Sequence, residues 1–215
     1  YFMNSRCRID HIVIGSSNLI LGTSAMESKL SHKFSPGGEH QIMGTHNNLL
    51  KLQTNIYLEV IANNPNADKL TRPRWFSLDE KKIIEKIKDT PRALCWVLEV
   101  ENIEDTVKNC GYNPGEILQL SRDSMNWKVT VPTDGKLIDN GILPILIEWN
   151  KDQHPSKKLS NSSVSLNRIS LYHQEPKKIK QIISNLIHSD LIEVSEGAPK
   201  IELILKTQNG EIIID

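Results

Sequence analysis

His11 and Glu59 are the first candidates for chemistry in this sequence. Glu59 lies between Leu58 and Val60, and His11 lies in a similarly apolar run near the start of the chain. A carboxylate buried in a strand needs a partner, because an unpaired buried charge either costs several kcal/mol or is neutralised by a shift of its pKa. We therefore expect His11 to be the partner of Glu59, as a pair that moves a proton or anchors a ligand.

A strand-helix-strand-strand-strand order occurs three times and must position these side chains. In the first copy, apolar periodicity and turn residues predict a strand, a helix and three further strands at 8–14, 19–30, 34–43, 47–53 and 57–62. The pattern starts again at Arg92, after a linker with an amphipathic helix. It starts a third time with a strand at 166–172 and a helix at 176–187. Repeats in a fixed order indicate repeated structural units, so we expect an α+β fold of antiparallel-rich sheets, with helices on one side.

The repeats also set the expected domain boundaries. The first unit comprises two modules and a linker helix, and the third module follows a polar connector. The expected ranges are 4–62 for module one, 63–90 for the linker, 91–150 for module two and 162–215 for module three.

Aligning the second copy on the first adds two residues to the candidate site. A gapless alignment of 92–111 on the opening strand and helix places Cys95 opposite His11. The ILIEW segment resembles the strand that carries Glu59, and this similarity places Glu148 opposite Glu59. We therefore expect His11, Glu59 and Glu148 to point inward together, with Cys95 as a further member of this group or as an inert buried thiol.

Composition excludes several classes of function. The 26 basic and 26 acidic residues give a formal net charge of zero, and their even spread argues against nucleic-acid and membrane partners. Three cysteines at no metal-like spacing argue against a disulfide framework and favour a cytoplasmic protein. The longest apolar run is too short to span a bilayer. Neither a P-loop nor a G-x-S-x-G elbow occurs, which argues against the common nucleotide-dependent enzymes and serine hydrolases and leaves a small molecule or a protein as the expected partner.

Other polar and aromatic residues are candidates for contact with that ligand, each with packing or turn formation as the alternative. His46 and Asn47 begin a strand that is expected to cross the site, and Arg122 is suited to an anionic group. Tryptophan side chains would supply flat apolar walls. The three candidates of this kind are Trp75, Trp96 and Trp127.

The combination of these segments resembles the glyoxalase-like domain proteins of the vicinal oxygen chelate superfamily. The matching segments are IDHIVIG, GG-x-H, GTHNNLLKL, YLEVIA, the Arg-Pro and Trp-Phe pairs of the linker, TVP with GILPILIEW, and His154-Pro155. The resemblance implies that two βαβββ modules pair to form a cup with the site on its concave face. It also implies a divalent Zn, Mn, Fe or Ni ion held by His11, Glu59, Glu148 and the Cys95 position.

Two functions follow from this resemblance. One is a metal-dependent lyase, isomerase or dioxygenase in which Glu59 or Glu148 moves a proton. The other is a metal-free protein that binds a small molecule in the same cup without turnover. Because modules of this architecture work in pairs, we also expect module three, at 162–215, to pair with its copy in a homodimer.

Overall fold

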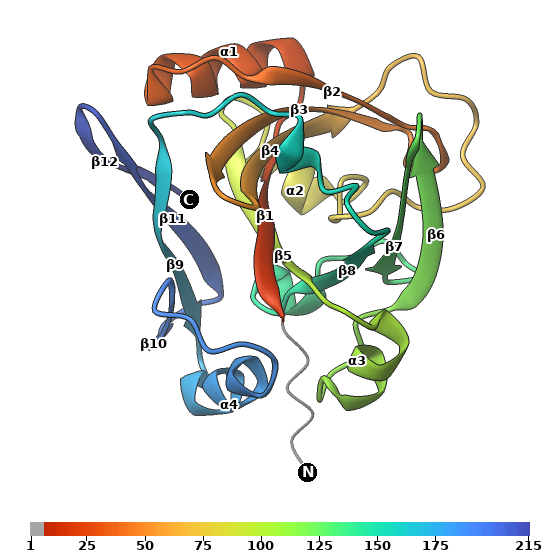
Figure 1. Cartoon of the computed structure of the whole chain (residues 1–215), viewed down its shortest axis with the longest axis vertical. Coiled ribbons are helices and arrows are strands. Elements are labelled where there is room, and N and C mark those ends of the chain that lie inside the picture. Colours follow the sequence, from red (N-terminus) through yellow and green to blue (C-terminus); the bar gives the residue numbers. More distant parts are fainter. Residues whose placement is uncertain (1–6) are drawn as a thin grey trace.

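The computed structural model describes residues 7–215 and contains three βαβββ modules, as the sequence predicts (Figure 1). The predicted start of module one at residue 4 lies outside the described residues. Its elements are β1 (Arg8–Gly15), α1 (Leu19–Leu30), β2 (Ser35–His40), the short helix η1 (Gln41–Met43), β3 (Thr45–Gln53) and β4 (Ile56–Asn63). Helix α1 has the predicted bounds, because the Asn18 side chain accepts a hydrogen bond from the Leu21 amide and caps its start.

Modules two and three repeat the same order. Module two comprises β5 (Arg92–Glu99), α3 (Ile103–Asn109), β6 (Glu116–Arg122), β7 (Met125–Val131), η2 (Ile138–Gly141) and β8 (Ile145–Trp149). The linkers contain α2 (Lys81–Lys86) and η3 (Pro155–Lys157). Module three comprises β9 (Ser165–His173), α4 (Pro176–Leu186), β10 (Ile192–Glu196), β11 (Lys200–Thr207) and β12 (Gly210–Ile214).

Modules one and two share one curled sheet of eight strands. The strand order is β2-β3-β4-β1-β5-β8-β7-β6, so antiparallel pairing of β1 with β5 joins the two modules at its centre. The sheet curls until its two edge strands, β2 and β6, contact each other (Figure 1). This curvature creates the concave cup.

The linker between the modules fills part of the cup. Trp75, Phe76 and Leu78 are buried in the apolar cluster that also contains Val97, Val129 and Ile147 on the inner faces of the strands. Phe76 and Ser77 both have left-handed backbone conformations, and the Ser77 hydroxyl accepts a hydrogen bond from the Leu137 amide. The linker therefore supplies aromatic side chains to the interior.

Module three packs on the outside of the curled sheet. It forms a separate sheet of order β10-β9-β11-β12, whose apolar residues Leu171 and Leu203 share one core with Ile12, Ile14 and Trp96 of the main sheet. This chain therefore covers the apolar face of module three itself. The homodimer stays a prediction. Among residues 7–215, no helix is long and apolar enough to cross a membrane.

Candidate functional site

A small chamber of about 40 Å³ lies inside the cup. A cavity holds a water molecule once it offers roughly 10 to 15 Å³, so the chamber accommodates only a few atoms. Its polar lining residues are His11, His40, Asn47, Tyr57, Glu59 and Arg122, and its largest apolar ones are Trp75, Phe76, Trp127 and Trp149.

His11 and Glu59 meet at the floor of this chamber, as the sequence predicts. His11 Nε2 lies 3.5 Å from Glu59 Oε2, and both side chains are buried. Asn47, on β3, donates a hydrogen bond from Nδ2 to Glu59 Oε1 and accepts one from the Gly38 amide at Oδ1. The carboxylate is thus held from two sides.

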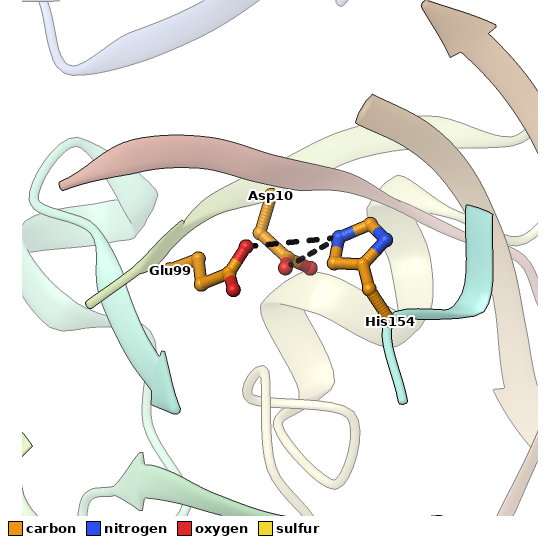
Figure 2. Close-up of side chains that lie close together, drawn as sticks. All are labelled: Asp10, Glu99 and His154. Carbon is orange, nitrogen blue, oxygen red and sulfur yellow. Dashed lines mark hydrogen bonds and ion pairs between the residues drawn. The ribbon is translucent and has the colours of Figure 1, made fainter. Parts of the chain in front are cut away.

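Asp10, a residue that the sequence analysis missed, organises the other side of His11. Its Oδ1 is hydrogen-bonded to His11 Nδ1, and its Oδ2 accepts hydrogen bonds from Trp149 Nε1 at 2.8 Å and His154 Nε2 at 2.9 Å. Figure 2 shows the carboxylates of Asp10 and Glu99 both turned toward the His154 ring. His11 therefore lies between two buried carboxylates, those of Asp10 and Glu59.

These contacts set the charges in the chamber. Burial alone would lower the pKa of His11, but hydrogen bonds and attraction from Asp10 and Glu59 raise it to about 9. Burial opposes ionisation of both carboxyls, yet hydrogen bonds with His11 lower the pKa of Asp10 and of Glu59 below their ordinary values. At neutral pH the floor therefore holds an imidazolium between two carboxylates.

Aromatic rings form the walls. Tyr57 stacks on His11 with ring centroids 4.6 Å apart, and Trp127 lies against Trp149 at 5.3 Å. Trp75 donates from Nε1 to Thr45 Oγ1, and its ring meets His40 edge-on at 4.8 Å. The predictions that Trp75 and Trp127 are wall residues agree with this geometry.

A wider groove of about 440 Å³ lies beside the chamber, along β2, η1 and β6. The groove and the chamber share His40, Arg122 and Trp127 in their linings, so these residues form the neck between the two spaces. The predicted ligand residues Asn47 and Arg122 thus lie in the chamber and at its neck.

Glu148 does not join His11 and Glu59, which corrects the prediction. In the parallel pairs of the sheet, Val13 is opposite Glu59 and Val97 is opposite Ile145, so Ile145 occupies the position that matches Glu59. Glu148 instead accepts a hydrogen bond from the Ile103 amide of α3 and pairs with Lys128. A shift of three residues in the aligned sequences placed it on the wrong face of β8.

Three further candidates, Trp96, His46 and Cys95, are not among the residues that line the chamber. Trp96 packs in the outer core and donates to the Ile142 carbonyl. His46 is absent from the lining, because it alternates with the inward-facing Asn47 on β3. Cys95 belongs to the inner apolar cluster, where burial raises the pKa of its thiol well above its ordinary value.

The metal site implied by the resemblance does not fit these residues. Ile145, which occupies the position expected for Glu148, has no ligand atom, and Cys95 is not among the residues that line the chamber. That leaves His11 and Glu59 as ligands in the chamber, whereas a catalytic site of this kind ordinarily takes three ligands from the protein. The function proposed below therefore uses no metal at this position.

Asp10, Glu99 and His154 form a different group that could hold a metal ion, because one ligand atom from each lies within 4.8 Å of the others (Figure 2). The hydrogen bonds argue against an ion there. The Ser156 amide donates to His154 Nδ1 at 3.2 Å, so the ring proton lies on Nε2, where it is donated to Asp10. Glu99 already pairs with Arg8.

Comparisons with known proteins agree with this architecture. A family model described as "Glyoxalase-like domain" matches residues 9–187. A hypothetical protein from Staphylococcus aureus has 16% identity and a TM-score of 0.58, over 97% of this chain and 84% of that one, which supports the fold alone. The comparison with curated proteins finds no match.

Two solved structures are more distant. Methylmalonyl-CoA epimerase from Streptomyces coelicolor, in complex with 2-nitronate-propionyl-CoA, has 13% identity and a TM-score of 0.44, over 69% of this chain and 98% of that one. A hypothetical protein from Bacillus halodurans has 12% identity and a TM-score of 0.43, over 68% and 95% of the two chains.

Proposed function

Because the chain belongs to the glyoxalase-like domain family, within the vicinal oxygen chelate superfamily, we propose that its cup binds a small organic molecule. The observation that carries this proposal is the chamber together with the adjoining groove, which combine aromatic walls with a polar floor. Ligand sites in proteins are typically concave and mainly apolar, with a few polar groups that fix orientation. The chamber and the adjoining groove have this composition.

In this proposal the ligand binds without a metal. His11 and Glu59 act as hydrogen-bonding anchors at the floor, with Asn47 holding the Glu59 carboxylate in place. A metal-dependent lyase or dioxygenase of the predicted kind would need ligands at the positions of Cys95 and Ile145, where the chain offers a thiol outside the chamber lining and an apolar side chain. The donor set therefore supports the metal-free alternative.

The His11 and Glu59 pair favours proton transfer as a second candidate function. An imidazolium and a carboxylate lie 3.5 Å apart, and both line the chamber. At neutral pH His11 would act as the acid and Glu59 as the base toward a bound molecule. Slow exchange of deuterium from solvent into a bound ligand, lost in Glu59→Gln, would support this candidate, and no exchange in the native chain would contradict it.

Tryptophan fluorescence tests ligand binding directly. Three of the four tryptophans, Trp75, Trp127 and Trp149, line the chamber, whereas Trp96 lies in the outer core. We expect aromatic and branched organic molecules to quench the emission of the native chain in a saturable way. Trp127→Phe should lose a large share of the quenching, while the matched variant Trp96→Phe should retain it. A flat signal across a chemically diverse panel would contradict the proposal.

A further inference from the structure

The neck between chamber and groove contains hydrogen-bond donors that are poorly satisfied among the described residues. Arg122, at the end of β6, makes one long hydrogen bond among the described residues, from Nη1 to Asn47 Oδ1 at 3.4 Å, and no ion pair there. Its Nε is buried and has no partner among them. A guanidinium presents five N–H donors, and leaving a buried donor unpaired is costly, so Arg122 is suited to an acceptor that the chain does not supply.

His40 presents a second donor at the same neck. Trp75 Nε1 donates to Thr45 Oγ1, and His40 Nδ1 lies 3.2 Å from that oxygen. Thr45 is fully buried, so its hydroxyl proton needs an acceptor within the protein. Among the described residues, that acceptor is His40 Nδ1. The ring proton of neutral His40 is therefore on Nε2, which is free to donate to a ligand.

We propose that Arg122 and His40 form a clamp for a carboxylate, so that the ligand of the cup is a small aromatic carboxylic acid. This inference rests on the proposed function and names its ligand class. The chamber is too small for an aromatic ring, whereas the groove is large enough. Its lining includes Met43, Leu120 and Trp127 beside polar residues, among them Glu39 and Asp123. The carboxylate then lies at the neck and the ring lies in the groove.

The buried carboxylates nearest the clamp are engaged by another residue. Glu59 and Asp10 are both turned toward His11, so that the Arg122 guanidinium is left without a carboxylate partner among the described residues. Hydrogen bonds between arginine and a carboxylate are charge-assisted and often bidentate, which makes them roughly twice as strong as neutral ones.

Gly38 allows Arg122 to reach this position. A Cβ atom on Gly38 would come within 2.7 Å of Arg122 Cδ and 3.0 Å of its Nε, so the guanidinium lies directly on the backbone of β2. Gly38→Ala should therefore move the guanidinium without removing its charge. This variant separates the geometry of the clamp from its electrostatics.

Binding of 2-naphthoate and 2-naphthamide, measured by tryptophan quenching, tests the clamp, because the two ligands differ only in the charge and acceptors of one group. We expect the native chain to bind the acid at least tenfold more tightly than the amide. Arg122→Met should weaken binding of the acid by about 10- to 100-fold, as expected for a lost charged hydrogen bond, and should leave binding of the amide nearly unchanged. Gly38→Ala should weaken binding of the acid several-fold. His40→Gln, which keeps a donor, should weaken this binding less than His40→Phe does.

Arg168→Met serves as the matched control, because Arg168 pairs with Glu193 in module three, away from the cup. Equal affinity for acid and amide, or an acid preference that survives Arg122→Met, would overturn the clamp while leaving the cup as a ligand site. No binding by any small molecule would overturn the clamp and the proposed function together.

Discussion

Replacing Asp10 with Asn is expected to destabilise the fold by about 3 to 5 kcal/mol, the usual cost of breaking a buried ion pair by removing one partner. The Asp10 side chain is fully buried and accepts from His154 and Trp149 while it faces the His11 imidazolium. An amide keeps the shape but not the charge, so His11 must either lose its proton or remain an uncompensated cation. Urea unfolding at pH 7 measures the difference.

Glu99→Gln is the matched control for this experiment. Glu99 is close to His154 but is partly exposed and paired with Arg8 at the surface, and burial raises the pKa of its carboxyl. Exposed pairs contribute about 0 to 1 kcal/mol, so this variant should remain near the native stability. Equal and small losses in the two variants would show that Asp10 is not the counter-ion of His11.

Stability should fall by about 3 kcal/mol as the pH rises from 6.5 through 9, because of His11 alone. Its pKa rises from 6.5 to about 9 on folding. A shift of one pKa unit corresponds to about 1.4 kcal/mol of stability. A raised pKa means that the folded state binds the proton more tightly than the unfolded state. The contribution is therefore complete below pH 6.5, decreases above it and is lost once the pH passes 9.

The difference between the native chain and His11→Gln isolates this effect, because other titrating groups are common to both. We expect the two stability curves to differ in slope between pH 6.5 and 9 and to run parallel above pH 10. Curves that run parallel through the whole window would show that His11 does not carry a raised pKa in the folded state. Chemical unfolding at half-unit pH intervals provides the data.

The modular fold was predictable because several local signals agreed. Turn residues, the Asn18 cap and apolar periodicity repeat in the same order three times, and each copy folds as predicted. The partnership of His11 with Glu59 was also predictable, since two ionisable groups in apolar strands need each other. These inferences depend on local sequence or on a simple requirement for charge compensation.

Sheet register could not be read from the sequence. The similarity of ILIEW to the Glu59 strand placed Glu148 in the site, but the register of β5 and β8 places Ile145 there. Successive side chains of a strand point to opposite faces, so a shift by an odd number of residues inverts the prediction. Trp96 and His46 were wrong for the same reason, as both lie on strands whose neighbouring residues face the cup.

Asp10 was missed because alternation would direct it away from His11. The pairing of β1 with β5 is irregular between Ile9 and His11, and this irregularity leaves Asp10 without a β5 partner. His154 lies 144 residues further along the chain, so that no local pattern links it to Asp10. The available signals were the acidic residue beside His11 in an apolar strand and the His154-Pro155 pair after the second module.

In the proposed function the cup binds its ligand without the metal that the superfamily resemblance implies. Elemental analysis of protein purified without chelators or metal-affinity steps tests it most directly, on the native chain beside Glu59→Gln and His154→Gln. We predict no divalent metal near one per chain in any sample. A near-stoichiometric metal that is lost in Glu59→Gln would place an ion in the cup, and one lost only in His154→Gln would place it with Asp10 and Glu99; either result would contradict the account.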